Sequence, residues 1–552
     1  MSTQRPVKVE KNSVLVGNRN RLNLIEGANV TLTVVDDPTD NEIEVTIAAS
    51  AGTALIDPES YIMWRDGATY YCRNGATSAV TSNANFVTLI NATIAGANAG
   101  DSIHIKPGTY IVATSIVGAS GVSIIGEDYP LFDARTMAAS DTIIEYIGSL
   151  SAAYNLNANA AAQDATITMA NTGAIAGGDW VYLQSAAIWK GNDKNMLQGE
   201  IFRAGVVVAN TSITLPTDSG IIDAYTTANT AHVHRISPMI DVTISGIKFL
   251  GETGDNLLGV LFELCVNCHI YNCRFDTVQW EAVDFYNSVG GSAHDNTMYR
   301  CNRAGFGYGV VLNNCCQGIR VYSNFMDECR HGVAIGGFTA PGIPRSIDIT
   351  DNHITNGYDD SAIDCHSVGE NIVIKGNVIN HANYGIATRF HSGVIANNVI
   401  IGCFVDGIQH VGSDETLGSG VVISGNKVDH CDKGIQVDDA PYVSITGNVV
   451  SYCRFQGIDI NNSPNGSLTG NVIHNNSQHT NNTYDGIDLD TDSNGWVISG
   501  NRVYSNAANR QRYGLNNAGD NNLIIGNHLT DGGATGALND TGAGTTNAHN
   551  VV

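Results

Sequence analysis

The sequence is poor in basic residues. It contains 28 Lys and Arg against 53 Asp and Glu in 552 residues, a formal net charge of −25. A protein that binds nucleic acid through its phosphates is normally basic, so we expect no nucleic-acid partner. The acidity suits a chain that holds Ca²⁺. It also disfavours an anionic substrate, unless the binding site itself is locally basic.

Long apolar runs are also absent. No run approaches the ~18 residues of a membrane-spanning helix, so we expect no membrane span. The first residues, MSTQRPVKVEKNSVLVG, lack the apolar core of a signal peptide. Charged residues make up only 15% of the chain, whereas there are 60 Gly residues. Low charge with abundant Gly indicates many short strands and tight turns rather than helices.

A repeat organises the chain from residue 241 onward. Its first phrase ends in Gly-Asn-x-apolar, as in VIKGNVI (373–379) and VISGNKV (422–428). A second phrase, Gly-Ile-x-apolar, follows about ten residues later, as in YGIAT (384–388). Both phrases alternate apolar and polar residues, which is the period of a half-buried strand. We count about twelve copies of ~25 residues, which predicts an all-β fold, a right-handed parallel β-helix of about twelve coils.

The repeat also explains the asparagines and cysteines. The Asn of the first phrase predicts a ladder of side-chain amides from coil to coil. The chain has twelve Cys. Five of them follow this Asn by five residues, and we expect them to stack in the core as reduced thiols: Cys301, Cys329, Cys403, Cys431 and Cys453.

Upstream of the repeat we predict three further regions. Residues 1–54 form a small β module with a hairpin and a linker, and residues 55–140 form the entry to the β-helix, with a capping helix. Residues 141–235 form an inserted β subdomain, and 236–552 form the main β-helix. The stretch at 20–48, NRLNLIEGANVTLTVVDDPTDNEIEVTIA, resembles a module found near the N-termini of phage tail-fibre and tailspike proteins. The stretch at 85–127, with IKPGTY, resembles the entry to pectate-lyase-like β-helices.

The tail-fibre resemblance has implications for location and partners. It implies a protein of the virion tail, or an extracellular one. It also implies that residues 1–54 bind other tail proteins, and that the β-helix carries a receptor-binding or polysaccharide-degrading activity.

Candidate catalytic residues lie on the outer positions of the coils. When the Gly-Ile phrases are aligned, Asp364 and His366 share one outer face, and Arg389 lies one coil further along. The preceding coil offers only Ala334 and Gly336, which leaves room for a bound chain. Further polar residues gather around this face as candidate substrate-binding residues: Arg330, His331, Tyr358, Asp359, Asp360, Tyr384, His391 and Gln409.

The segment Ser361–His366, SAIDCH, resembles the Tyr-Gly-Phe-Asp-Pro-His motif of mannuronan C5-epimerases and alginate lyases. The motif's Asp and His correspond to Asp364 and His366, and its Tyr position is Ser361. Tyr384 fills the same slot one coil later. The resemblance implies action on an anionic, uronate-containing polysaccharide such as alginate, by C5-epimerisation or β-elimination, with no required cofactor.

The chemistry of these residue types fits that reaction. Arg389 is suited to bind the uronate carboxylate in a bidentate manner, and His366 to remove H5 as a base. Asp364 either orients His366 or, when protonated, neutralises the substrate carboxylate. Tyr384 or Tyr358 supplies a proton.

Two alternatives stay open. The segment GYDDSAID (357–364) also resembles the paired-Asp segment of polygalacturonase-type hydrolases, in which Asp359, Asp360 and Asp364 would be acid and base. This resemblance implies that the protein is a glycoside-hydrolase depolymerase of the tailspike kind. The other alternative is a non-catalytic receptor-binding fibre.

A calcium loop is a further candidate. The segment DGIDLDTDSNG (485–495) places Asp488, Asp490 and Asp492 at alternate positions. This spacing resembles a calcium-binding loop, although Ser493 stands where a Gly is expected.

Overall fold

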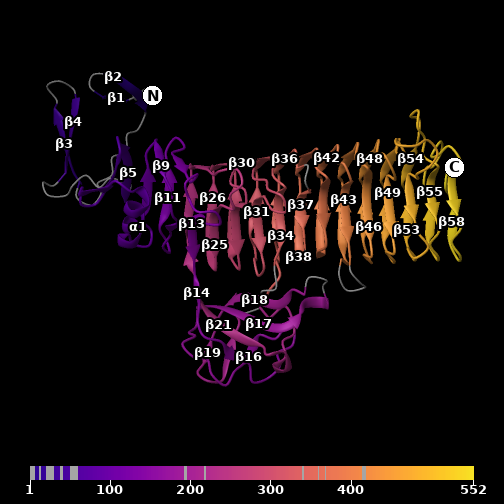
Figure 1. Ribbon diagram of the computed structural model, residues 1–552, viewed down its shortest axis with the longest axis horizontal. Helices are drawn as coiled ribbons and strands as arrows, with labels where there is room; N and C mark the ends of the chain where they lie inside the picture. Colours follow the sequence, from indigo (N-terminus) through magenta and orange to yellow (C-terminus); the bar gives the residue numbers. More distant parts are fainter. Residues whose placement is uncertain are drawn as a thin grey trace, which may run out of the picture.

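The computed structural model describes residues 60–552 apart from 192–194, 217–218, 338–340, 358–359, 367 and 413–417, together with four upstream strands. The chain winds into a right-handed parallel β-helix (Figure 1). This confirms the predicted fold class. The solenoid has about 16 turns with a repeat of ~26 residues, more than the twelve copies visible in the sequence. Turns built by residues 102–147 lack the repeat Asn, and the polar tail forms one further turn.

Each turn contributes one strand to each of three parallel sheets, which we call sheets 1, 2 and 3. Sheet 1 contains β10 (Ile116–Val117), β13 (Thr142–Ile147), β25 (Leu258–Glu263), β28 (Glu281–Tyr286), β31 (Tyr308–Asn313), β34 (His331–Gly336), β37 (Ser361–Cys365), β40 (Tyr384–Thr388), β43 (Asp406–Val411), β46 (Lys433–Asp438), β49 (Ile458–Asn461), β52 (Ile487–Leu489), β55 (Tyr513–Asn517) and β57 (Gly536–Asp540).

Sheet 2 contains β8 (Ser102–Ile105), β11 (Ser123–Gly126), β22 (Met239–Ile240), β23 (Thr243–Ser245), β26 (Cys265–Tyr271), β29 (Val289–His294), β32 (Arg320–Tyr322), β35 (Asp348–Thr350), β38 (Glu370–Lys375), β41 (His391–Ala396), β44 (Val421–Ser424), β47 (Ser444–Thr446), β50 (Ser467–Thr469), β53 (Val497–Ser499), β56 (Leu523–Ile525) and β58 (Thr546–Ala548). Sheet 3 contains β9 (Thr109–Ile111), β12 (Leu131–Asp133), β24 (Lys248–Leu250), β27 (Arg274–Asp276), β30 (Thr297–Tyr299), β33 (Phe325–Asp327), β36 (His353–Thr355), β39 (Val378–Asn380), β42 (Val399–Ile401), β45 (Lys427–Asp429), β48 (Val449–Ser451), β51 (Val472–His474) and β54 (Arg502–Tyr504).

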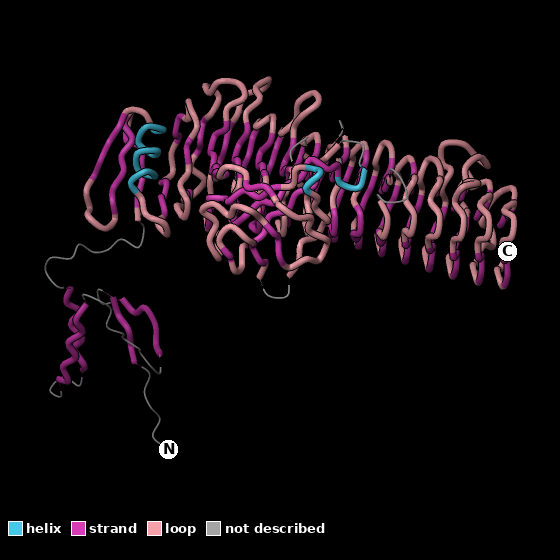
Figure 2. Tube along the Cα trace, turned by 90° about the horizontal axis from the view of Figure 1, so that it is seen from below, coloured by secondary structure: helices cyan, strands magenta, loops and turns pink. Residues whose placement is uncertain are grey.

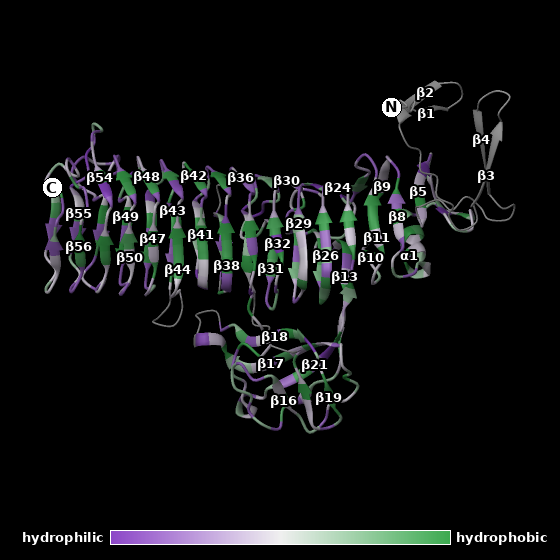
Figure 3. Cartoon of the chain, turned by 180° about the vertical axis from the view of Figure 1, so that it is seen from behind, coloured by the Kyte–Doolittle hydropathy of each residue, from purple (hydrophilic) through white to green (hydrophobic). Residues whose placement is uncertain are grey.

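Inward-facing apolar residues stack in columns from turn to turn. On sheet 1, Ile363 lies between Val333 and Ile386 in the paired strands, and all three are fully buried. Apolar residues recur in successive strands along the solenoid (Figure 3). All twelve cysteines are free and buried, as expected for core thiols. The core is therefore one continuous apolar rod, and the outer positions of each strand are left for polar residues.

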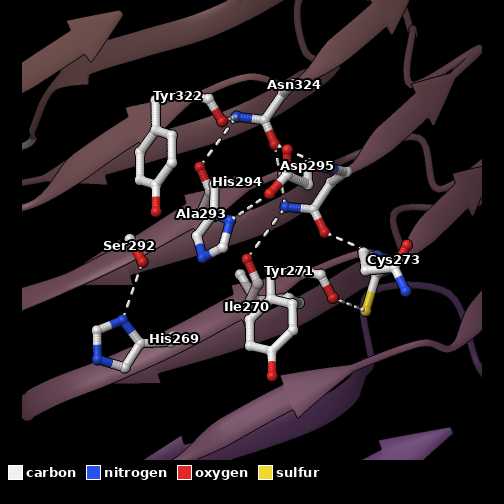
Figure 4. Close-up of polar contacts among 12 residues, drawn as sticks. His269, Ile270, Tyr271, Cys273, Ser292, Ala293, His294, Asp295, Tyr322 and Asn324 are labelled. Atoms are coloured by element: carbon white, nitrogen blue, oxygen red, sulfur yellow. Dashed lines mark hydrogen bonds and ion pairs between the residues drawn. The ribbon is translucent and has the colours of Figure 1, made fainter. Parts of the chain in front are cut away.

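The repeat asparagines form the predicted ladder. From Asn296 to Asn527, each side-chain Nδ2 donates to the Oδ1 of the Asn one turn on, at 2.9–3.0 Å, and the series ends at Asn550. Figure 4 shows part of this ladder, where Asn324 donates to the Ala293 carbonyl at 2.9 Å. The residue before each Asn turns the corner in the left-handed region. Gly376, with φ 70°, is one example, and this explains the Gly-Asn phrase.

The same register places like side chains over one another on the outer faces. Tyr271, His294 and Tyr322 end three successive strands of sheet 2 (Figure 4). The His294 ring stacks on Tyr271 at 5.0 Å and on Tyr322 at 4.5 Å between centroids. The register therefore decides which outer residues from different turns meet.

The N-terminal end of the solenoid is capped by a helix, as predicted. Helix α1 (Phe86–Gly96) begins at Asn85, whose side chain accepts from the Thr88 amide, and it lies at the N-terminal end of the rod (Figure 2). An antiparallel set precedes it: β5 (Tyr61–Asp66), β6 (Thr69–Asn74) and β7 (Val80–Asn83). Upstream, β1 (Val7–Lys11) pairs with β2 (Val14–Arg19), and β3 (Val30–Asp37) pairs with β4 (Glu42–Ala49). The β3–β4 pair is the hairpin expected in the N-terminal module, and the parts of residues 1–54 other than these four strands lie outside the described residues.

A β subdomain is inserted between β13 and β22, as the sequence predicts. One of its sheets contains β14 (Ser149–Leu150), β15 (Tyr154–Asn155), β17 (Trp180–Ile188), β18 (Leu197–Arg203) and β21 (His232–Ser237), and the other contains β16 (Thr166–Thr168), β19 (Val207–Val208) and β20 (Ser212–Thr214). Two short 3₁₀ turns, η1 (Trp189–Gly191) and η2 (Thr227–Asn229), complete it. Figure 1 shows it beside the solenoid. No helix of the described residues is long and apolar enough to cross a membrane.

A buried arginine fastens this subdomain to the solenoid. Arg345 is 2% exposed and donates to Asp223 of the subdomain at 2.5 Å and to Glu370 of β38 at 2.9 Å. Its third contact is the Gly199 carbonyl at 3.0 Å. Because burial of an unpaired guanidinium is costly, both carboxylates are needed to hold it there. The subdomain is thus fixed next to the turns that follow β31, β34 and β37.

We predict that Asn398→Ala destabilises the β-helix. Asn398 is fully buried, donates to Asn426 and to the Ile374 carbonyl, and accepts from Asn377. Its loss leaves buried donors and acceptors unpaired, which costs about 1–3 kcal/mol for each group. Denaturant unfolding is expected to show a clearly lower midpoint. Asn550→Ala, at the partly exposed end of the ladder, is the matched control and should shift the midpoint much less. Equal midpoints for Asn398→Ala and the wild type would contradict a stabilising ladder.

Candidate active-site groove

The candidate site lies on the outer face of sheet 1, centred on β37. Paired strands place Ala334, Asp364, Ala387 and Gln409 in one outer column. Ser361 is paired with Tyr384 in a neighbouring column. The predicted outward column is therefore present, and small residues lie on either side of Asp364.

Asp364 and His366 form a hydrogen-bonded pair. The Asp364 Oδ2 atom lies 2.9 Å from His366 Nδ1. The Asp364 side chain is only 4% exposed, whereas that of His366 is 58% exposed. An ionised carboxylate can only accept, so Nδ1 carries the proton and Nε2 is left with its lone pair. His366 thus presents a free basic nitrogen on the outer side of the sheet.

Asp364 stays ionised in this setting. Burial alone would raise its pKa, but the hydrogen bond from His366 and the charges of His331 and Arg389 outweigh burial and hold the pKa below its usual value. Arg389 Nη1 lies 3.6 Å from Asp364 Oδ1 and 3.5 Å from the Cys365 carbonyl. These long contacts leave most of its donors uncommitted. The geometry supports an orienting role for Asp364, in preference to the protonated form.

Next to this pair lie the buried His331 and the partly exposed Arg330 and Asp360. His331 is 1% exposed, its Nδ1 lies 2.8 Å from the Ser361 carbonyl, and its ring stacks on Tyr308 at 5.2 Å. Burial lowers the pKa of His331, although Asp364 and Asp360 act in the opposite direction. Arg330 donates to Asp360 at 2.5 Å and to the Tyr308 hydroxyl at 3.2 Å. His331 also lies 3.8 Å from Asp364 Oδ2, and the carboxylate of Asp360 is engaged by Arg330.

The remaining sequence candidates are more scattered. Tyr384 is partly buried, and burial raises the pKa of its hydroxyl. Gln409 lies two turns beyond Asp364 and donates to Asp406 at 3.2 Å. His391 is the first residue of β41 on sheet 2, in strand register with Glu370 of β38, and its Nδ1 lies 2.9 Å from the Ser419 hydroxyl. It therefore lies on a different sheet from Asp364. Tyr358 and Asp359 lie outside the described residues.

A cleft opens beside His366 toward the N-terminal turns. It has a volume of about 120 Å³ and is lined by Trp280, Glu281, Phe306, Tyr308, Val311, Asn313, Ala334, Ile335, Gly336, Gly337 and His366. Trp280 stacks on Phe306 at 4.2 Å between centroids, with the rings 16° apart. Ala334 and Gly336 leave this space open, as the sequence predicts.

Two features of this cleft were missed among the catalytic candidates. The first is Tyr308, which lies between Glu281 and His331 in one column, because β28, β31 and β34 pair in register. The sequence pattern singled out His331, Ser361 and Tyr384 at the first position of their strands, but that column was not followed back to Tyr308. The Trp280–Phe306 stack escaped because the two residues lie in different loops.

The calcium candidates do not converge in the described part of the chain. Asp490 accepts from the Asn462 amide at 3.0 Å and from the Ser493 hydroxyl at 2.7 Å, so it caps a turn. Asp488 accepts from Asn516 at 2.8 Å. Among the described residues no three Asp, Glu, His or Cys side chains are grouped as a metal site. Calcium binding by Asp488, Asp490 and Asp492 stays a prediction.

Comparisons with known proteins agree with the fold. Residues 406–552 match a family model described as a right-handed β-helix region. No curated protein matches the sequence. The tailspike gp61 of Pseudomonas phage phi297 has a similar structure, with a TM-score of 0.51 and 14% identity over 82% of this chain and 72% of that one.

A second tailspike, gp49 from Pseudomonas phage LKA1, gives a TM-score of 0.51 at 16% identity, over 83% of this chain and 75% of that one. The A-module of a mannuronan C-5 epimerase from Azotobacter vinelandii gives 0.39 at 12% identity, over 85% of this chain and 95% of that one. At these identities the two tailspikes show the fold alone. The chain is thus a right-handed parallel β-helix protein that shares its fold with phage tailspikes.

Proposed function

We propose that the groove acts on a uronate-containing polysaccharide by removing the proton at C5, leading to C5-epimerisation or β-elimination. The observation that carries this proposal is the Asp364–His366 pair, 2.9 Å apart, with Arg389 3.6 Å from the same carboxylate. A base and a carboxylate-binding cation are the two groups that this reaction needs.

In the first step Arg389 binds the uronate carboxylate and withdraws charge from it. His366 Nε2 then accepts H5, the C5–H bond breaks, and the electron pair is delocalised into the carboxyl group. Asp364 holds the His366 ring in the required tautomer and stabilises its cationic form. This division of roles matches the general logic of an Asp–His pair, in which the carboxylate orients the base.

The second step distinguishes the two outcomes. In epimerisation a proton is returned to C5 from the opposite face of the ring. In β-elimination the C4–O4 bond breaks, a C4–C5 double bond forms, and the leaving oxygen takes a proton. Tyr308 is well placed as the donor, because it lines the same cleft as His366. Burial raises the pKa of its hydroxyl, which Arg330 partly offsets, so Tyr308 remains protonated at neutral pH.

The proposed setting is that of a phage tail protein or an extracellular protein, with residues 1–54 binding other tail components. The fold shared with tailspikes supports this setting. A glycoside hydrolase or a glycan-binding fibre would use the same fold. The products separate these activities, because a lyase yields unsaturated ends, an epimerase changes H1 and H5 signals without shortening the chain, and a hydrolase releases saturated reducing ends.

We predict that His366→Ala and Arg389→Ala each lower turnover of a susceptible uronan by at least ~10²-fold, because one removes the base and the other the carboxylate-binding cation. Initial rates from ultraviolet absorbance and proton NMR measure this. His430→Ala is the matched control, since His430 Nδ1 also lies 3.1 Å from an aspartate, Asp429, but away from the groove. It should keep full activity. Wild-type rates in both groove variants would exclude the proposed site.

A second prediction identifies the proton donor. Tyr308→Phe removes only the hydroxyl that Arg330 positions, and it is expected to lower kcat by about 10²-fold with little change in KM. Tyr384→Phe is the paired variant and is expected to have a smaller effect, since Tyr384 does not line the cleft that holds His366. Rates on one uronan for both variants decide between the two residues. A loss confined to Tyr384→Phe would assign the donor to Tyr384.

A further inference from the structure

The outer face of sheet 1 carries charges in three zones along the solenoid. The charged residues of the N-terminal zone are all carboxyls: Glu145 of β13, Glu263 of β25, and Glu281 and Asp284 of β28. The central zone holds Arg389 and His366 beside the buried Asp364, together with Arg330 paired to Asp360. The C-terminal zone has Asp406, Asp438, Asp459 and Asp488, with Lys433 paired to Asp459 at 2.6 Å. One cationic subsite is therefore flanked on both sides by carboxyls.

Two of the N-terminal carboxyls, Glu281 and Asp284, are buried and close enough to affect each other. Burial raises the pKa of Glu281 to about 7. Burial, and then the charge of Glu281, also raise the pKa of Asp284, to which Asn313 donates at 3.0 Å. Both carboxyls are therefore held toward their protonated forms, and each ionises less readily beside a further negative charge. Such a pair can donate to and accept from hydroxyl groups, but a third carboxylate beside it is strongly disfavoured.

The C-terminal zone has the same bias. Asp406 is 2% exposed, and burial raises its pKa to about 7 although Lys433 acts in the opposite direction. Burial also raises the pKa of Asp438 and of Asp488. The one lysine of this zone is already engaged by Asp459. A uronate carboxylate placed here would meet carboxyls and, among the described residues, no free cation.

The cleft next to His366 offers a surface of another kind. Its wall is the Trp280–Phe306 stack, and Glu281 lies at its edge. Aromatic rings pack against the apolar face of a sugar ring, while carboxyls bind its hydroxyls. The cleft thus has the surface that an uncharged sugar needs, directly beside the cationic subsite.

We propose that the groove binds a heteropolysaccharide in which each uronate is flanked by uncharged sugars, and that Trp280, Phe306 and Glu281 bind the uncharged neighbour on one side. This inference rests on the proposed function, because it takes Arg389 and His366 as the uronate subsite. It argues against a polymer of consecutive uronates, in which every neighbouring residue would carry its carboxylate into an acidic zone.

The test measures binding and turnover separately. Binding is measured by isothermal titration against polymannuronate, in which every residue is charged, and against hyaluronan and deacylated gellan, in which uncharged sugars flank each glucuronate. We expect hyaluronan or deacylated gellan to bind at least ten-fold more tightly than polymannuronate. Trp280→Ala should weaken that binding about ten-fold, and Trp280→Phe should largely restore it.

A variant that removes two negative charges tests the inference independently of Trp280, whose replacement could also disturb folding. Glu281→Gln combined with Asp284→Asn should improve binding of polymannuronate several-fold, because the acidic zone is removed. Asp348→Asn on β35 of sheet 2 is the matched control and should leave the preference unchanged. Equal or tighter binding of polymannuronate by the wild type would overturn the inference and leave the proposed chemistry standing. A binding preference for spaced polymers without any epimerised or unsaturated product would support the inference and overturn the chemistry instead.

Discussion

The register between successive turns is the constraint on which the rest of this structure depends. A parallel β-helix has no local hairpin turns to fix how its turns align, and a shift of one residue would exchange inward and outward side chains. The asparagine ladder removes this ambiguity. Each buried amide is satisfied only when the Asn of the next turn is level with it, at 2.9–3.0 Å. A slipped register would leave several buried polar groups unpaired at once.

The site follows from this register. Asp364 and Arg389 are far from adjacent in sequence, yet the pairing of β37 with β40 brings them within 3.6 Å. The pairing of β31 with β34 aligns Tyr308 with His331, and β34 is the strand one turn before β37. Asp364 lies on β37, whereas His366 and Arg389 directly follow the ends of β37 and β40, so the inner faces of these buried strands limit how far the three groups can move. Rigid support of this kind favours the narrow geometry that proton abstraction requires.

Much of the fold could be predicted from the sequence because it repeats a local pattern. The Gly-Asn corner, the alternating strands and the buried cysteines each have a direct physical reading, and these agree with the structure. The limits appear where no repeat exists. The turns at 102–147 and the last turn around Asn550 lack a visible copy, so the length was underestimated. The burial of Asp364 was also missed, because strand alternation places it outward and says nothing of the His331 and Arg389 that cover it. The Trp280–Phe306 stack joins two loops, and no periodicity predicts such a contact.

The contrast between net charge and local charge explains how an acidic chain can have a site for an anion. At physiological salt the Debye length is about 8 Å, so the distant carboxylates of a −25 protein are largely screened. The carboxyls within the groove are buried, close and poorly screened. In the proposed groove, discrimination between charged and uncharged sugars therefore depends on short-range contacts at each subsite and not on the electric field of the whole molecule. This is the physical reason why, in the proposed groove, the guanidinium of Arg389 beside the base His366 would suffice for one anionic subsite while the neighbouring carboxyls disfavour a second.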